Sequence, residues 1–239
     1  VLVNTPSGST LLDDTINEFD VSSDGKFISA PLDNGHVNIL DASTLEVTKT
    51  LGHSNSKAKN EEFSGEAVSA AIWRPGGQVD ELVTAGYDMA VCRWAGKSGV
   101  RRKRLLVNSV LAEQGDRSQV FNPPYVVSAK FDPTGDNLVA GLGDGSLLWW
   151  QYDQRSRDQV RWNAPHWWQG HCSALPGLAW LNKDQLVSFG NDKRLLLWNL
   201  DRDNVERSTA RPTHEIALGD SPNALDVEPS KKMILAATI

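Results

Sequence analysis

A single pattern of short apolar runs separated by polar turns returns four times along the chain. Each copy has an alternating apolar run, a polar turn, a second apolar run, a tight turn rich in Gly, Asp or Asn, and a third run. The third run ends near Leu40, Trp94, Trp150 and Trp198, which are 54, 56 and 48 residues apart. Alternation with a period of two and turn residues at every break predict short antiparallel strands. Because no segment shows an amphipathic helical stripe, the chain is expected to be all-β.

A repeat of about 50 residues with four short strands is typical of one blade of a β-propeller. Complete blades are predicted at about residues 16–52, 67–107, 125–163 and 171–218, with a partial blade over residues 222–239. We therefore expect residues 1–239 to form a single β-propeller domain. Residues 1–15 would be the tail of a preceding blade.

The last complete copy carries polar residues at a spacing known from one family. Gly170-His171 precedes Trp198-Asn199 by 26 residues, which resembles the Gly-His and Trp-Asp dipeptides of the WD-repeat family. The resemblance implies a buried tetrad of His, Ser or Thr, Asp and Trp, joined by hydrogen bonds, at His171, Ser188, Asp192 and Trp198. It also implies seven blades, which need roughly 315 residues. An N-terminal part of the ring is therefore expected to be missing, because an open array would expose strand edges.

The other copies keep this tetrad to different degrees. The second copy keeps the spacing of Thr84, Asp88 and Trp94, with His53 as a candidate fourth member. The third copy keeps Asp144 and Trp150 but has alanine at the hydroxyl position, and the first copy has Leu40 in place of Trp. We interpret the pairing of His171 with Asp192 as a structural strut rather than a catalytic pair, because each member of such a buried network finds a partner.

A closer resemblance is to the family of WD repeat-containing protein 53. It is carried by Leu82–Met89, Ile39-Leu40-Asp41, Gly52-His53-Ser54-Asn55 and Asn191-Asp192-Lys193. This resemblance implies a substrate receptor of a cullin-4 ubiquitin ligase. Such receptors carry Trp-Asp-x-Arg after the third strand, whereas no Arg stands at that place after any Trp anchor here. The ligase role is therefore an alternative to a general scaffold.

Cysteine count, charge and motifs limit the classes of function. Cys92 and Cys172 are the only cysteines, which favours a reducing compartment, the cytoplasm or the nucleus. No apolar run approaches the roughly 18 residues of a membrane span. The sequence has no nucleophile elbow and no phosphate-binding glycine loop, and its histidines lack metal-ligand spacing. We therefore expect no enzyme, no metal and no cofactor, with a propeller hydrolase as a third alternative.

The run Arg101-Arg102-Lys103-Arg104 is the densest cluster of charge. We interpret it as a solvated outer strand whose charges discourage aggregation at the sheet edge. The functional alternative is a patch for an acidic protein, for nucleic acid or for an import receptor. The net charge of −6 argues against a protein whose whole surface embraces nucleic acid.

Partner binding is predicted at the rim formed by the tight turns. The candidate residues are Asp33, Tyr87, Met89 and Lys193 on the turns, with Trp167 and Trp168 as a second zone if either is exposed. Insertions at 54–66 and 108–124 would lie on the same rim, with disordered surface loops as the equal alternative. The chain is predicted to be a non-catalytic scaffold or adaptor that binds other protein subunits, without a membrane or small-molecule partner.

Overall fold

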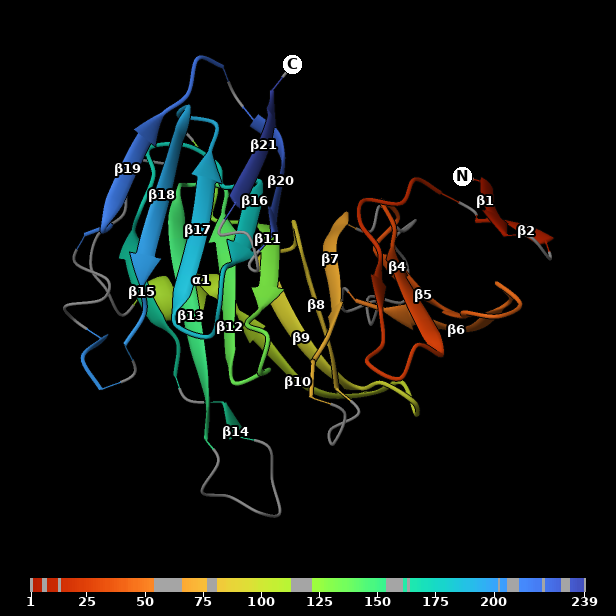
Figure 1. The fold of residues 1–239 in the computed structure, drawn as a ribbon. Coiled ribbons are helices and arrows are strands. Elements are labelled where there is room, and N and C mark those ends of the chain that lie inside the picture. Colours follow the sequence, from red (N-terminus) through yellow and green to blue (C-terminus); the bar gives the residue numbers. More distant parts are fainter. Residues whose placement is uncertain are drawn as a thin grey trace. The chain divides into compact units, whose positions relative to one another are not determined.

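The computed structural model forms two compact units, residues 1–107 and 108–239. It describes residues 2–5, 8–12, 14–53, 66–76, 81–112, 122–153, 161–162, 164–201, 203–205, 211–220, 222–228 and 233–238. Antiparallel strands dominate these residues (Figure 1), which confirms the all-β prediction. Within the same residues, no helix is long and apolar enough to cross a membrane.

Unit 1 contains a two-stranded hairpin and two four-stranded sheets. The hairpin pairs β1 (Leu2–Thr5) with β2 (Gly8–Leu11). The first sheet follows the chain order through β3 (Asp20–Val21), β4 (Phe27–Pro31), β5 (His36–Asp41) and β6 (Val47–Gly52). The second sheet has the same order, through β7 (Val68–Trp73), β8 (Glu81–Gly86), β9 (Ala90–Ala95) and β10 (Val100–Leu106).

Unit 2 repeats this arrangement. One sheet contains β11 (Val126–Phe131), β12 (Asn137–Leu142) and β13 (Ser146–Asp153), and β13 pairs with both β14 (Arg161–Trp162) and β15 (His166–Gln169). The next contains β16 (Gly177–Trp180), β17 (Gln185–Gly190), β18 (Arg194–Asn199) and β19 (His214–Ala217). The last described strands, β20 (Pro222–Glu228) and β21 (Met233–Thr238), form a pair.

Two local features differ from the expected pattern. The first apolar run of the first copy is a strand only at its end, in β3, and Ile16 makes an isolated bridge to Leu32. The segment that begins the second insertion is a short helix, α1 (Val107–Ala112). Residues 54–65 and 113–121, which make up most of both insertions, lie outside the described residues.

The core of unit 1 lies between its two four-stranded sheets. Val37, Ile39 and Leu51 of the first sheet pack against apolar residues of the second, among them Leu82 and Trp94. The second strand of the second sheet, β8, is buried along its whole length. A strand covered on both faces needs apolar residues at consecutive positions, which explains why the alternation weakens there.

The core of unit 2 is built around tryptophan. Trp149 and Trp168 of the β11–β15 sheet pack with Trp180 and Trp198 of the β16–β19 sheet. The Trp149 side chain is fully buried, and its indole N–H donates to Asn137 Oδ1 at 3.0 Å. Trp150, its neighbour on the strand, is also buried, but on the opposite face of β13 because adjacent side chains in a strand alternate.

The turns between second and third strands share one backbone conformation. In each, the third turn residue has a positive φ and its N–H donates to the carbonyl that closes the turn. Two copies have glycine there, Gly35 and Gly145, whereas the other two have Met89 at φ 55° and Lys193 at φ 62°. A non-glycine residue in this region carries strain of roughly 1–2 kcal/mol.

Replacing Gly145 with alanine is expected to lower the free energy of unfolding by about 2–3 kcal/mol. Gly145 has φ +88°, and a Cβ there would lie 2.3 Å from the carbonyl oxygen of His171. Lys193→Gly is the matched control in the next sheet, since it removes strain at the same turn position and should change stability by less than about 1 kcal/mol. Urea denaturation measures the free energy of unfolding of both variants. Equal losses from the two substitutions would show that the two turns do not share this backbone conformation.

Candidate functional site

The end of each sheet that carries these turns is the candidate site. In unit 1, the turn of Asp33 and the turn of Tyr87 flank the start of β7. The N–H of Val68 donates to Leu32 O, and the N–H of Tyr87 donates to Ala67 O. Asn17 adds a further tie, because its side-chain amide donates both to Asp33 Oδ1 and to Val68 O. The structure therefore brings Asp33, Tyr87 and Met89 to one rim of unit 1.

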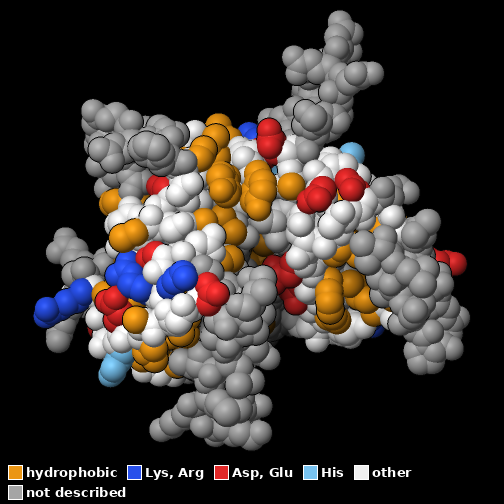
Figure 2. Space-filling view, turned by 90° about the horizontal axis from the view of Figure 1, so that it is seen from above, with side chains coloured by type: hydrophobic (Ala, Val, Ile, Leu, Met, Phe, Trp, Pro, Cys, Tyr) orange, Lys and Arg blue, Asp and Glu red, His pale blue; other side chains and the backbone are white. Residues whose placement is uncertain are grey.

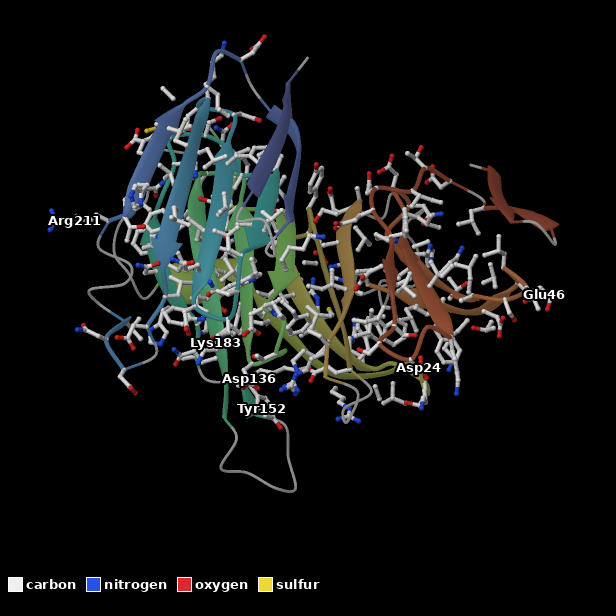
Figure 3. All side chains as sticks on the ribbon, viewed as in Figure 1. Asp24, Glu46, Asp136, Tyr152, Lys183 and Arg211 are labelled. Atoms are coloured by element: carbon white, nitrogen blue, oxygen red, sulfur yellow. The ribbon has the colours of Figure 1, made fainter. Side chains whose placement is uncertain are left out.

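The side chains on this rim differ in exposure. Tyr87 is 44% exposed, Asp33 is exposed and Met89 is half-buried. Figure 2 views the molecule from above Figure 1, and hydrophobic, acidic and basic side chains are all visible on that face. The opposite ends of the sheets carry the turns marked by Asp24, Asp136 and Lys183 in Figure 3. The rim of unit 1 thus presents an aromatic residue beside a carboxylate on a fixed backbone.

A buried tetrad lies directly beneath the Tyr87 turn. His53 Nδ1 lies 2.7 Å from Thr84 Oγ1, and the indole N–H of Trp94 donates to the same oxygen at 2.8 Å. The other ring nitrogen, Nε2, lies 3.0 Å from Asp88 Oδ1, which also accepts from the N–H of Ala90. The network links β8, β9 and the residue that follows β6, so it fixes the turn that carries Tyr87 and Met89.

Charge strengthens this tetrad. Arg104 on the outer strand donates to Asp88 Oδ2 at 2.9 Å. Burial alone would raise the pKa of Asp88, but His53 and Arg104 lower it, to about 2. Burial likewise lowers the pKa of His53, yet Asp88 and Cys92 together raise it by more, so that it reaches about 9. At neutral pH the cluster therefore holds a charged His53 and a charged Arg104 on one carboxylate.

The last complete sheet has a second tetrad, with the imidazole turned the other way. His171 Nδ1 lies 2.9 Å from Asp192 Oδ1, and Nε2 lies 2.9 Å from Ser188 Oγ, which accepts from Trp198 Nε1. Burial lowers the pKa of His171 despite the opposing effect of Asp192. A neutral His171 donates to Asp192 through Nδ1 and accepts from the Ser188 hydroxyl at Nε2. Both ring nitrogens and the Ser188 hydroxyl therefore have hydrogen-bond partners.

The remaining two copies replace the tetrad with local contacts. The Asp144 carboxylate accepts from the backbone and the hydroxyl of Ser146. In the first sheet, Asn34 Oδ1 accepts from the backbone N–H of His36, and Leu40 is buried in an apolar cluster. Each contact closes the turn between the second and third strands of its sheet without a buried histidine.

In unit 2, Lys193 lies on the turn between β17 and β18. It is exposed, and its ammonium group lies 3.1 Å from Asp220 Oδ1. Arg194 next to it contacts both Asp192 and Glu215. Burial lowers the pKa of the Arg194 guanidinium, but these two carboxylates raise it by more, above its ordinary value. The unit 2 rim is therefore a set of ion pairs at the surface.

The expectation for the two adjacent tryptophans needs a correction. Trp168 is 4% exposed and meets Trp198 edge-on, with ring centroids 5.6 Å apart, so it is part of the core and not a contact residue. Trp167 is half-buried on β15. The two side chains point to opposite faces of the strand, so packing against the next sheet buries one and leaves the other nearer the surface.

Sequence reasoning missed the arginines that complete both tetrads. Arg104 on the outer strand β10 contacts Asp88, and Arg194, two residues after Asp192 in the sequence, contacts Asp192. It also missed the buried carboxylate of Glu81, which accepts from Arg93. The position of Arg194 next to the turn was a possible signal, whereas the contact of Arg104 depends on strand register. Among the described residues, no group of His, Cys, Asp and Glu could hold a metal ion.

The sheets and their tetrads define the fold of a WD-repeat β-propeller. No protein-family model matches the sequence. The chain is 26% identical over 201 residues to ribosome biogenesis protein YTM1 of Yarrowia lipolytica, across 82% of this chain and 36% of that protein. It is also 26% identical over 150 residues to ribosome biogenesis protein YTM1 of Eremothecium gossypii, across 57% of this chain and 32% of that protein. The chain thus spans about a third of the length of these relatives.

A solved structure supports the same fold. A chain in the crystal structure of the mitotic checkpoint complex superimposes with a TM-score of 0.68 at 18% sequence identity. The superposition covers 97% of this chain and 60% of that one. At this identity the likeness concerns the fold alone.

Proposed function

We propose that the chain is a non-catalytic scaffold within an assembly that builds ribosomes. The observation that carries the proposal is the match to two ribosome biogenesis proteins, one of which extends over 82% of the chain. The location of the chain would be the nucleus or the cytoplasm, since the chain has only two cysteines and neither is in a disulfide. The partners would be other protein subunits.

The rim of unit 1, defined as Asp33, Tyr87 and Met89, is the proposed docking surface. Hydrogen bonds on both sides of β7 and the tetrad under Asp88 hold its turns in place. Because the turns are already held, binding there fixes few additional rotatable bonds, and less conformational entropy is lost on association. Tyrosine and methionine are also enriched at protein interfaces. Lys193 is proposed as a charged contact residue on unit 2 by itself, and Trp167 as a separate apolar one.

The strained backbone of Met89 adds to this proposal. Glycine occupies the same turn position in two other copies without strain. Strained residues persist where the surrounding structure holds them, and they gather at functional sites. At φ 55° the backbone of Met89 sets the direction in which its side chain leaves the turn.

Replacing Tyr87 and Met89 together with alanine is expected to release the chain from precursor ribosomal particles. A tagged chain expressed in its native cell should co-sediment with these particles in a sucrose gradient. The double variant should lose at least about tenfold of that signal, because aromatic interface residues often contribute 2 kcal/mol or more. Thermal melting of the purified variant should stay near the wild-type value, since Tyr87 is on the surface.

Lys183→Ala on the opposite end of a unit 2 sheet is the matched control, and it should leave sedimentation unchanged. Absence of the wild-type chain from the particles would overturn the proposed assembly. Full recovery of the double variant would overturn the rim alone. Recovery of a cullin-4 ligase with the chain, in place of ribosomal precursors, would support the alternative suggested by the resemblance to WD repeat-containing protein 53.

A further inference from the structure

Polar side chains from the first sheet and the segment before it donate to backbone carbonyls along β7 of the second sheet. The bonds run from Asn17 Nδ2 to Val68 O at 3.0 Å, from Ser29 Oγ to Ala71 O at 2.7 Å and from Ser23 Oγ to Arg74 O at 3.2 Å. Val68 is the first residue of β7, and Arg74 directly follows its last. The three bonds therefore tie the two sheets of unit 1 together along the whole length of β7.

The Asn17 tie differs from the other two because it lies at the rim and has a second arm. The same amide nitrogen donates to Asp33 Oδ1 at 2.9 Å, and its two N–H groups allow both bonds at once. The backbone holds the two residues together as well, since the N–H of Asn17 donates to Pro31 O and the N–H of Asp33 donates to Thr15 O. One amide thus fixes the Asp33 carboxylate relative to the start of β7.

The start of β7 is also the point at which the second rim turn is attached, because the N–H of Tyr87 donates to Ala67 O. The N–H of Val68 donates to Leu32 O in the other turn. The direction of the Asp33 carboxylate is therefore set against the same short piece of backbone that carries the turn of Tyr87 and Met89. Asn17 makes this link through a side chain, so a single substitution removes it and leaves the backbone bonds in place.

We propose that Asn17 is a positioning residue of the rim, which holds the Asp33 carboxylate in the direction that meets a hydrogen-bond donor of a partner protein. The inference rests on the proposed docking of partners at the rim. A carboxylate has about four acceptor sites and Asn17 occupies one of them, so the held group can accept a further donor. Asp33 lies on an exposed turn, and without Asn17 its side chain would have to be ordered by the partner, which costs affinity.

The test measures the affinity of the labelled chain for isolated precursor ribosomal particles by fluorescence anisotropy. Asn17→Ala should weaken this affinity about three- to tenfold, the effect expected from the loss of one hydrogen bond. Ser23→Ala is the matched control, because it removes a tie between the same two sheets at the other end of β7 and Ser23 is likewise exposed. It should leave the affinity within about twofold of wild type, and urea denaturation of both variants shows that they are folded.

A double-mutant cycle with Asp33→Ala separates positioning from a purely structural role. In the Asp33→Ala background, Asn17→Ala should weaken the affinity by less than about twofold, because the carboxylate that Asn17 holds is already gone. A structural role through Val68 O alone would give the same fold-change in both backgrounds, and that result would overturn the inference.

Two further outcomes separate this inference from the proposed function. Particle binding by wild type together with an unchanged affinity of Asn17→Ala would overturn the role of Asn17 and leave the scaffold proposal standing. Failure of the wild-type chain to bind the particles would overturn the scaffold proposal, and the role of Asn17 with it.

Discussion

Replacing Trp198 with alanine is expected to lower the free energy of unfolding by about 3–5 kcal/mol, the usual cost of removing a buried large aromatic side chain. Trp198 is 1% exposed, and its ring packs edge-on against Trp168. Its indole N–H donates to Ser188 Oγ, which in turn contacts His171. The substitution therefore opens a cavity and removes one partner of a buried hydrogen-bonded network.

Two further variants separate these contributions. Trp198→Phe keeps part of the ring volume and removes the N–H, so it should cost less than the alanine variant. Leu40→Ala at the equivalent place in the first sheet removes a side chain that is 2% exposed but makes no polar contact through it. Denaturant midpoints followed by tryptophan fluorescence measure all three, and an unchanged midpoint for Trp198→Ala would show that the anchor position is misassigned.

Replacing Asp88 with asparagine is expected to cost about 3–5 kcal/mol near pH 6, because removing one partner leaves buried charge without compensation. Asp88 contacts both the His53 ring and the Arg104 guanidinium. The substitution keeps the shape of the side chain and removes its charge. Urea denaturation of wild type and variant at several pH values gives the difference in stability.

The pH dependence of this difference has a defined sign. The pKa of His53 rises from 6.5 to about 9 on folding, so its contribution is complete below pH 6.5 and is lost as the pH rises through 9. The pKa of Asp88 falls from 3.8 to about 2, so its contribution is present above pH 3.8 and is lost as the pH falls through 2. The cost of Asp88→Asn should therefore be greatest between pH 3.8 and 6.5 and smaller at pH 10.

Asp192→Asn in the other tetrad is the matched control. The pKa of His171 lies below its ordinary value, so this histidine is already neutral above pH 6.5. The cost of Asp192→Asn, about 1–3 kcal/mol from unpaired donors, should stay constant from pH 7 to 10. The same pH profile for both variants would contradict the different charge states of the two histidines.

The sequence alone was sufficient for the repeat and the class of fold. Leu40, Trp94, Trp150 and Trp198 recur at intervals of a blade, and the turn residues between them recur with the same spacing. Local signals of this kind survive without tertiary information, because strand alternation and turn geometry depend on neighbouring residues. The resemblance of the four tetrad residues to a known pattern then pointed to the WD-repeat propeller, which the structural likeness supports.

The candidate site was predicted less completely. The sequence places Asp33, Tyr87 and Met89 in tight turns, and the structure brings the two turns to either side of β7. The prediction of Trp168 as a contact residue is wrong, because Trp168 is buried. Neighbouring tryptophans on a strand point to opposite faces, and the sequence does not show which face packs against the next sheet. That choice depends on register, and a shift of one residue exchanges the two faces.

What the sequence determined by itself is the set of strands, their turns and the residue types of each tetrad. Tertiary structure decided which charges meet. Arg104 reaches Asp88 because the β9–β10 register, with its bulge, places an outer-strand guanidinium over the turn. The protonation of the two histidines was decided in the same way, because a pKa depends on burial and on charges from strands distant in sequence. Sequence spacing fixes neither quantity, so two similar tetrads hold a charged His53 and a neutral His171.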